Sequence, residues 1–374
     1  MKISFNNKDF LKALTLARKV APKKSSFSAL ECFCLKTNRN NNSFQLIASN
    51  LEITLAKTVN AKFFGNDSDF ECIIEFDKIM KAVKQFSESE TWLNMGEQVG
   101  FIQHFTLENG NRTFKGVANV DENSVSLLSD YFEKEKVYES YILGANLDNM
   151  IERINSIKYA IATNDIRPIL KGVNFKDNRI CAMDGYRCCV SEDKSDNSLC
   201  IDGEFTINPS AFLILKGFDE HEFNLYINSK NIEIETDTIN VIVKCMNDNY
   251  RNYENYFPRD FTAKVKADTK QMISDLKYIH SQYDVKNPEP VVWKDNELST
   301  STVSAKIELE GKSKEIHTGF NINYFYDCIS NINTEKIEFC YSGKLTPMLV
   351  KSVESNAYNN LYALVLPVKL KEEK

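Results

Sequence analysis

The chain has 374 residues, of which 43% are hydrophobic and 26% are charged, and its formal net charge is −6. This composition excludes a disordered chain, and the length favours two or three domains with well-formed cores. The apolar runs fall far short of the roughly 20 residues that a membrane-spanning helix needs. Lys8, Asp9 and Lys12 interrupt any signal-peptide pattern. We therefore expect a cytoplasmic protein that has no membrane partner.

Ten cysteines and four histidines could suggest disulfides or a metal site. The chain contains neither a C-x-x-C pair nor an H-E-x-x-H motif, and adjacent residues such as Cys188 and Cys189 would point to opposite faces of a strand. We predict no metal site and no cofactor. The cysteines are interpreted as small buried residues in a reducing compartment.

The first third of the chain predicts a helix, several strands and a second helix. In residues 8–17 the apolar residues Phe10, Leu11, Leu14 and Ala17 form one stripe of a helix. Short alternating or β-branched runs then predict strands, and a second helix is expected with Asp77 as its cap. The expected strands are residues 29–37, 43–49, 51–59 and 70–75, and the second helix is expected over 76–86. Asn109–Gly110 is an expected turn.

The middle third repeats this order. Met150, Ile151, Ile154 and Ile157 form the stripe of a helix over residues 148–157. A second helix over 207–218 has Asn208 as its expected cap and Pro209 at its first position. Strands are expected around these helices in the runs 203–207, 231–237 and 239–246, and a turn between strands is expected at Asp184–Gly185.

The last third repeats the order again. Met272, Ile273, Leu276 and Ile279 form the stripe of a helix over residues 270–279. A second helix is expected over 320–332 with Asn321 as its cap. The expected strands are residues 305–311, 315–320 and 336–342.

The matching order predicts an α+β fold of three similar two-helix, multi-strand domains. We place them at residues 1–130, 138–257 and 258–374, with polar stretches as linkers. The alternative is two unrelated α+β domains whose amphipathic helices are ordinary.

Several stretches resemble the bacterial sliding clamp, the β subunit of DNA polymerase III, in order and over nearly the whole chain. "LIASNLEITLA" is similar to a strand pair of that family, with Asn50 in place of aspartate, and "AIATNDIRPILKGVNF" is close to A-x-D-x-x-R-P-I-L-x-G-V. "CAMDGYRCCV" resembles A-T-D-G-H-R-L-A, with Met183, Tyr186 and Cys188 as departures. "FNINYFYDCI" and "YALVLPVKL" resemble the family's F-N-x-x-Y-L-x-D-x-L and Y-x-x-M-P-M-R-L.

The resemblance implies a DNA-clamp fold, in which a head-to-tail homodimer closes a ring around double-stranded DNA. Such a clamp is a non-catalytic processivity factor. It tethers the replicative polymerase through its alpha subunit, is loaded by an ATP-dependent clamp loader, and binds other proteins that carry a clamp-binding motif. We expect Phe114 and the region around Ile279 to contribute to ring closure.

A ring around DNA needs positive charge only where phosphates pass, so the net charge of −6 does not exclude it. Lys78, Lys81 and Lys84 recur every three residues and cluster on one side of a helix. Family positions near DNA match Lys24, Lys78, Lys84, Asn164 and Arg167. The predicted DNA-facing residues are Lys8, Lys12, Lys23, Lys24, Lys78, Lys81, Lys84, Arg153, Lys158, Asn164, Arg167 and Lys277. The alternative for any one of them is ordinary solvated helix charge.

The resemblance also implies an apolar cleft between the second and third domains for a linear motif, roughly Q-L-x-L/F. Its implied residues are Leu170, Gly185, Tyr186, Arg187, Cys188, Tyr256, Pro347, Leu364, Val365, Leu366, Pro367, Val368 and Lys369. Departures at Tyr186, Cys188, Leu366 and Val368, and at Arg251 and Asn255 where the family has proline and arginine, affect which peptide fits. The alternative for residues 364–368 is the last strand of the third domain.

Two other functions were weighed. A nucleic-acid-processing enzyme such as a nuclease or a 3'-5' exonuclease needs convergent carboxylates, and the acidic residues here form no motif. The chain has no Walker A loop and no G-x-G-x-x-G. A clamp-like repeat scaffold with no role on DNA would lack a basic inner surface.

Overall fold

The computed structural model describes residues 1–65, 68–132, 137–164, 167–195, 200–284, 288–354 and 356–370. The chain forms two compact units, Met1–Leu147 with Ser210–Cys245 and Asp148–Pro209 with Met246–Lys374. Residues of the predicted middle domain therefore fall in both units, and the division into three domains stays a prediction. No described helix is long and apolar enough to cross a membrane.

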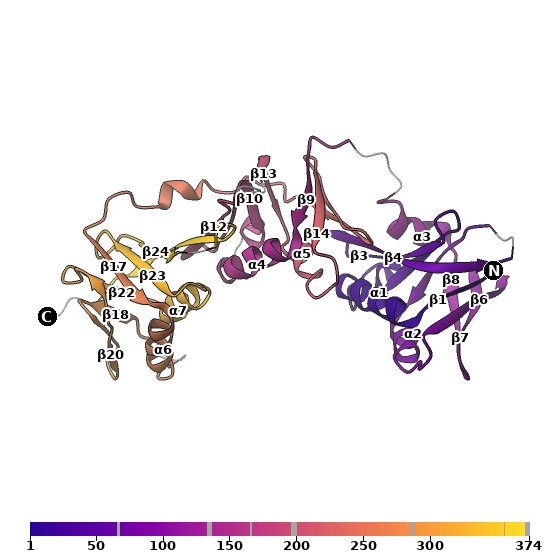
Figure 1. Ribbon diagram of the computed structural model, residues 1–374, viewed down its shortest axis with the longest axis horizontal. Helices are drawn as coiled ribbons and strands as arrows, with labels where there is room; N and C mark the ends of the chain where they lie inside the picture. Colours follow the sequence, from indigo (N-terminus) through magenta and orange to yellow (C-terminus); the bar gives the residue numbers. More distant parts are fainter. Residues whose placement is uncertain are drawn as a thin grey trace. The chain divides into compact units, whose positions relative to one another are not determined.

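Unit 1 is built on one twelve-stranded antiparallel sheet (Figure 1). Its strands, in spatial order, are β1 (Lys2–Asn6), β6 (Glu90–Val99), β7 (Ile102–Asn109), β8 (Arg112–Asn119), β5 (Glu71–Glu75), β2 (Cys32–Asn38), β3 (Ser43–Ser49), β4 (Ile53–Phe64), β16 (Ile239–Lys244), β15 (Asn231–Glu235), β14 (Glu222–Ile227) and β9 (Ser140–Asn146). Because β1 also pairs with β4, the first eight strands close on themselves. That closure removes exposed edges.

The core of unit 1 forms where helix α1 (Asn7–Val20) packs on β3 and β4. Phe10 of α1 meets Phe5 at 4.8 Å and Phe44 at 6.0 Å between ring centroids, and all three are buried. α1 also packs on α2 (Phe76–Val83). The predicted cap Asp77 is wrong: α2 follows Glu75, and Asp77 lies in its first turn. A further helix, α3 (Glu122–Ser129), is capped by Asp121 and was missed.

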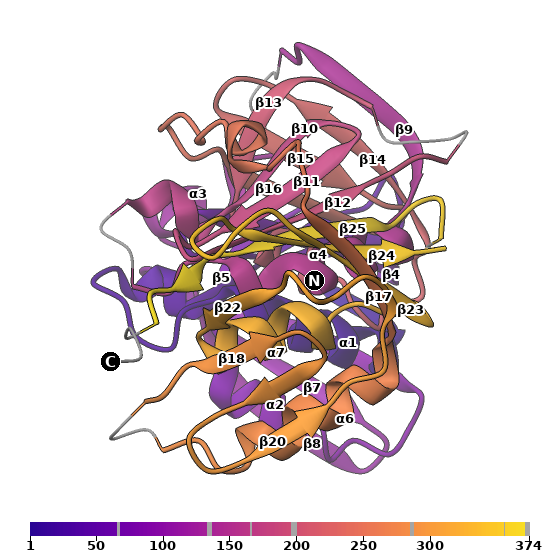
Figure 2. The same cartoon turned by 90° about the vertical axis from the view of Figure 1, so that its left-hand side faces the viewer.

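Unit 2 holds two sheets and the neighbouring helices α6 and α7 (Figure 1, Figure 2). α6 contacts β17 of the larger sheet and β20 of the smaller one, and α7 contacts β25 of the larger sheet. The nine-stranded sheet runs β13 (Ile201–Ile207), β10 (Val173–Asp177), β11 (Arg179–Met183), β12 (Arg187–Glu192), β25 (Asn360–Val365), β24 (Met348–Val353), β23 (Lys336–Tyr341), β17 (Ala263–Asp268) and β21 (Glu310–Gly311). The five-stranded sheet runs β20 (Ser304–Lys306), β19 (Glu297–Ser299), β18 (Val291–Lys294), β22 (His317–Phe320) and β26 (Pro367–Val368). The predicted strand 305–311 is broken, because its two ends join different sheets.

The helices of unit 2 follow the predicted stripes. They are α4 (Leu147–Ile157), α6 (Thr269–His280) and α7 (Ile322–Ser330). Leu147, the first residue of α4, is the last residue of the first segment of unit 1. Unit 2 also contains the 3-10 turns η2 (Lys158–Ala160), η3 (Pro168–Lys171) and η4 (Tyr253–Tyr256). Asn321 caps α7 as predicted, accepting hydrogen bonds from the backbone N–H groups of Asn323 and Tyr324. Of the predicted helix 207–218, only α5 (Ser210–Leu213) is helical, and the chain turns after it. α5 belongs to unit 1.

In each unit, strands from two different predicted domains pair and continue the same sheet. In unit 1, β4 pairs with β16 through residues 53–57 and 239–243. In unit 2, β12 pairs with β25 through residues 187–192 and 360–365. Both ladders are antiparallel, so each sheet runs without a break from one predicted domain into the next.

Candidate functional site

A mostly apolar cavity of about 320 Å³ lies in unit 2, where β11 and β25 end and β12 begins. Leu170 of η3, Cys188 of β12 and Leu364 of β25 form its floor and are each almost fully buried. The remaining lining residues are Arg167, Met183, Gly185, Tyr186, Arg187, Arg251, Tyr256, Pro347 and Leu366. Apolar walls with a few polar groups at the rim are typical of a site that binds a small or peptide ligand.

The turn between β11 and β12 shapes one wall of this cavity. The Asp184 carboxylate accepts hydrogen bonds from the backbone N–H groups of Tyr186 (2.9 Å) and Arg187 (3.0 Å), and from Arg187 Nε (2.9 Å). Gly185 has φ +90°, where a Cβ would be strained, and a Cβ there would lie 3.5 Å from Arg167 Nη2. The D-G pair therefore fixes a tight turn whose far side presents Tyr186.

The chain's tail forms the opposite wall. The backbone N–H of Leu366 donates a hydrogen bond to the carbonyl of Tyr186 at 2.9 Å, which joins the tail to the turn. Leu364 and Leu366 face the cavity, whereas Val365 is fully buried and does not line it, because alternate strand residues point to opposite faces. The placement of Val365 in the cleft is therefore wrong.

Three further tail residues also lie outside the cavity lining. Pro367 and Val368 pair with Phe320 and Gly319 in the five-stranded sheet, and Lys369 is exposed beyond them. The reason is the change of sheet after Leu366, which turns the chain away from the cavity. Nine of the thirteen residues predicted for the cleft line this cavity: Leu170, Gly185, Tyr186, Arg187, Cys188, Tyr256, Pro347, Leu364 and Leu366.

Three lining residues were not predicted for the cleft. Met183 and Cys181 lie on the same face of β11, and Cys181 Sγ is 3.6 Å from Sγ of Cys188, a cleft residue. Strand alternation alone could therefore have placed Met183 in the cleft. Arg251 lies in an irregular segment for which no periodicity is available. Arg167 was predicted to face DNA instead.

Arg187 is held rigidly beside the cavity. Its guanidinium bonds Asp184 and also donates from Nη1 to Asp327 of α7 at 2.6 Å, and it lies 4.6 Å from the centroid of the Tyr324 ring. Burial opposes its charge, but the hydrogen bond to Asp327 and the charge of Asp184 outweigh burial, so the pKa of Arg187 is raised above its ordinary value. Arg187 is therefore a fixed cation that ties β12 to α7.

A second, more polar cavity of about 780 Å³ adjoins the first and shares Arg167, Tyr186 and Arg187 with it. Its other lining residues are Lys158, Tyr159, Ile161, Ala162, Thr163, Asn164, Asp184 and Tyr324. Three residues predicted to face DNA, Lys158, Asn164 and Arg167, thus lie together beside the apolar cavity.

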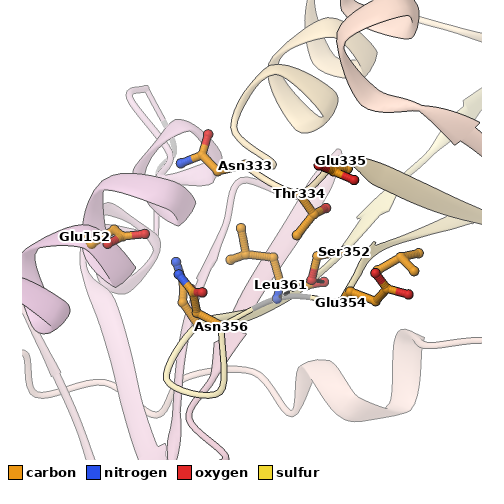
Figure 3. Close-up of a pocket in the computed structure, with 10 residues that line it drawn as sticks. Glu152, Asn333, Thr334, Glu335, Ser352, Glu354, Asn356 and Leu361 are labelled. Atoms are coloured by element: carbon orange, nitrogen blue, oxygen red, sulfur yellow. Dashed lines mark hydrogen bonds between the residues drawn. The ribbon is translucent and has the colours of Figure 1, made fainter.

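A third cavity, of about 410 Å³, lies between α4, the segment after α7 and the β24–β25 hairpin (Figure 3). Glu152, Glu335 and Glu354 give it an acidic lining, and Glu152 accepts a hydrogen bond from the Tyr358 hydroxyl at 2.8 Å. Among the described residues no group of histidine, cysteine, aspartate or glutamate side chains is arranged to hold a metal ion. Its lining lacks the apolar floor that distinguishes the first cavity.

The other residues predicted to face DNA are mostly exposed in their own units. Lys8 and Lys78 lie on α1 and α2, Lys277 lies on α6, and Lys12 pairs with Asp219 at 2.6 Å. The exposed ones that remain are Lys23, Lys24, Lys81 and Lys84.

Arg153 does not face solvent, so its assignment to the DNA surface is wrong. It is 2% exposed, donates to Ser191 Oγ (3.0 Å) and to the carbonyl of Asn178 (2.8 Å), and lies 3.5 Å from Asp193. Burial lowers its pKa to about 10. Arg153 therefore connects α4 to the sheet instead of lining a DNA surface.

The architecture has close counterparts among solved structures. The beta subunit of DNA polymerase from Streptococcus pyogenes superposes with a TM-score of 0.84 at 14% identity over 99% of this chain and 100% of that one. The sliding clamp of Pseudomonas aeruginosa, in a structure bound to griselimycin, gives 0.83 at 18% identity over 99% and 100%. The fold is therefore the α+β DNA-clamp fold.

The sequence comparisons agree with the fold. The beta sliding clamp of Staphylococcus aureus is 21% identical over 341 residues, which is 85% of each chain. Residues 286–368 match the family model described as DNA polymerase III beta subunit, C-terminal domain. The chain is thus similar to beta sliding clamps over most of its length.

Proposed function

We propose that this chain is a DNA sliding clamp that encircles duplex DNA and tethers a replicative polymerase by a peptide seated in the apolar cavity. It is a non-catalytic processivity subunit. The observation that carries the proposal is the convergence of Leu170, Cys188, Leu364 and Leu366 on one cavity where β11 and β25 end and β12 begins. Apolar burial supplies the affinity of such a site, and the arginines at its rim supply orientation.

The exposed lysines of α1, α2 and α6 support binding of duplex DNA without sequence preference. Lysines attract phosphate without reading bases, which permits sliding. Lys8, Lys78 and Lys277 have exposed side chains, whereas Lys12 is partly neutralised by Asp219. The positive surface is therefore uneven between helices.

Ring closure needs a second copy of the chain. Val99, Ile102 and Val117 are 62%, 50% and 56% exposed, and they share the outer face of the β6–β8 hairpins. Exposed apolar side chains grouped in this way are typical of an interaction surface. Ile279, predicted to lie near the contact, is buried in the core of its own unit, but Tyr278 beside it is 53% exposed.

Retention on DNA tests the encircling function. The protein, loaded by an ATP-dependent clamp loader, should remain on nicked circular DNA and dissociate rapidly once the circle is linearised. The matched control blocks the ends of the linear DNA with bound protein, which should restore retention. Equal retention on circles and on open linear DNA would exclude a topological link.

Peptide titration tests the cavity. A fluorescent Gln-Leu-Ser-Leu-Phe peptide should lose at least tenfold in affinity when Leu366→Asp places a charge on the apolar wall, about 1.4 kcal/mol. Leu143→Asp is the matched control, since Leu143 is exposed on β9 and lines none of the three cavities above. Equal binding by both variants and the wild type would show that the peptide binds elsewhere.

A further inference from the structure

Two free thiols face each other at the floor of the apolar cavity. The Sγ atoms of Cys181 on β11 and Cys188 on β12 are 3.6 Å apart, and all ten cysteines of the chain are free. We propose that these two cysteines form a reversible dithiol–disulfide modification site, and that closing the disulfide reshapes the cleft and weakens peptide binding. The effect on the peptide rests on the proposed function of the cleft, whereas formation of the disulfide does not.

The register of the β11–β12 hairpin places both thiols on one face of the sheet. Cys181 lies opposite Val190 and Cys188 lies opposite Met183, so the two cysteines are diagonal neighbours across the ladder. Diagonal neighbours have Cα atoms about 7–8 Å apart, at the upper limit of what a disulfide spans. The two strands must therefore shift relative to each other before the sulfurs can bond. Disulfides that distort the surrounding backbone are readily reduced, so the modification is expected to be reversible.

A second pair of cysteines on paired strands shows what the register excludes. Cys34 of β2 lies opposite Ile73, and Cys72 of β5 lies opposite Leu35. Because adjacent strand residues point to opposite faces, Cys34 and Cys72 lie on opposite sides of their sheet. Both are fully buried, yet they cannot bridge. Cys72 is therefore a matched control for a buried thiol that has no partner across the ladder.

Only one thiol of the proposed site is open to a reagent. Cys188 is 5% exposed and lines the cavity of about 320 Å³, whereas Cys181 is 0% exposed and does not line it. Burial also raises the pKa of the Cys181 thiol well above its ordinary value, which disfavours its thiolate as the first nucleophile. A small oxidant such as hydrogen peroxide therefore reaches Cys188 first.

The chemistry needs only this peroxide and the two thiols. The Cys188 sulfur attacks one peroxide oxygen, the O–O bond breaks, and the products are a sulfenic acid and water. The Cys181 sulfur then attacks Cys188 Sγ, the S–S bond forms, and the S–O bond breaks to release a second water that carries the Cys181 proton. Two thiols lose two electrons to the peroxide, and a dithiol reductant such as dithiothreitol returns them.

Closing the disulfide alters the cavity because Cys188 lies between its two neighbouring strands. β12 pairs with β11 on one side, and on the other side Cys188 lies opposite Leu364 of β25. Cys188 and Leu364 both line the cavity. Movement of the Cys188 sulfur toward Cys181 draws it away from Leu364, so an apolar side chain on this floor loses contacts. The pattern that this chain resembles has leucine at position 188, so the paired thiols are a feature of this chain.

The test compares reduced and peroxide-treated full-length protein. Trypsin cleaves after Arg187, between the two cysteines, so a disulfide should join peptides 180–187 and 188–194 in a non-reducing digest of alkylated protein. Dithiothreitol should remove this link. A fluorescent Gln-Leu-Ser-Leu-Phe peptide should bind the treated wild type about fivefold more weakly and recover its affinity after reduction.

Two variants separate the disulfide from other oxidation. In Cys181→Ala no link can form, and the peptide affinity of this variant should be the same before and after peroxide. Cys72→Ala should respond to peroxide as the wild type does. Oxidation of Met183, which also lines the cavity, would persist in Cys181→Ala and would not be reversed by dithiothreitol. If Cys181→Ala is less stable in thermal unfolding, Cys188→Ala replaces it and is likewise compared with itself before and after peroxide.

Three results would overturn the proposal. Absence of the linked peptides from the treated wild type would exclude the disulfide. A link without a change in peptide affinity would exclude its effect on the cleft, as would an equal loss of affinity in Cys181→Ala. Failure of the reduced wild type to bind the peptide would instead overturn the proposed cleft and any effect on it, while the digest would still confirm or exclude the disulfide.

Discussion

The two sheet junctions use the same backbone arrangement but have different surroundings. At the β4–β16 junction of unit 1, Lys57 Nζ meets Glu220 at 2.9 Å and also contacts Thr238, so an ion pair fills the space beside the ladder. At the β12–β25 junction of unit 2, the chain leaves the sheet after Val365 and an apolar cavity lies beside the ladder. The apolar cavity, our candidate cleft, thus lies where a strand ends and its chain changes sheet.

The largest expected effect separates stability from binding at the β12–β25 junction. Leu364 is 3% exposed, so Leu364→Asp buries an unpaired carboxylate and should cost about 3–5 kcal/mol. Leu366→Asp, at a side chain that is 40% exposed, should change stability by no more than about 0.5 kcal/mol while still weakening peptide binding at least tenfold. Thermal unfolding of both variants measures the difference. Equal destabilisation would mean that Leu366 is part of the core.

The ion pair at the β4–β16 junction should matter for stability alone. Lys57→Met leaves Glu220 with one partner fewer and should cost about 2 kcal/mol. Burial opposes the charge of Glu220, but its hydrogen bond with Thr238 and the pairing with Lys57 outweigh burial, so the pKa of Glu220 is lowered.

Because the pKa of Glu220 is lower in the folded chain, the contribution of its ionised carboxylate to the free energy of unfolding depends on pH with a definite sign. It is fully present above the unfolded pKa of a glutamate, about 4.3, and is lost as the pH falls through the lower folded value. The stability difference between wild type and Glu220→Gln should therefore be constant at neutral pH and shrink below about pH 4. For the Lys57→Met variant, peptide affinity should equal that of the wild type. A changed affinity would contradict the expectation that the β4–β16 junction affects stability alone.

Two turn glycines provide a matched pair. Gly185 and Gly110 both close hairpins with positive φ, +90° and +57°. Alanine at either position should cost about 1–2 kcal/mol of backbone strain. Only Gly185→Ala should also weaken the peptide, because its turn presents Tyr186 to the cleft. Titration of both variants checks this, and an equal loss in Gly110→Ala would point to a general effect on folding.

The smallest expected effect is electrostatic. Arg251 lines the cleft and is exposed at its rim, so Arg251→Ala should weaken a peptide with an acidic residue beside its apolar anchor by about threefold at low salt. The loss should vanish at high ionic strength, where exposed charges are screened. Lys369→Ala is the control, since Lys369 is exposed outside the cavity lining. A salt-independent loss would indicate packing by the arginine stem.

Helix periodicity predicted α1, α4 and α6 well, because one apolar stripe suffices to orient a helix against a sheet. The error at Arg153 was avoidable. Arg153 lies three residues after Met150 and four before Ile157, and therefore on the buried face of α4. Its position on the helix predicts its burial better than its charge does. The brevity of α5 could not be predicted, since it depends on how β13 and β14 pair with distant strands.

The cleft was predictable only in part. The resemblance identified its floor, and strand alternation could have removed Val365 and added Met183. The departure of Pro367 and Val368 into the second sheet depends on pairing with Gly319 and Phe320, about fifty residues away, for which no local pattern exists. The shared wall at Tyr186 likewise follows from its stacking on Tyr324, a contact between distant segments.

The change of sheet after Leu366 has a mechanical consequence. β25 is paired on both sides, with β12 and with β24, and the two residues after Leu366 pair with β22. If the proposed peptide binds against Leu366, tension applied to it passes into backbone hydrogen bonds on both sides of that residue. Tension along the strand shears the bonds of the two β25 ladders together instead of opening them one at a time.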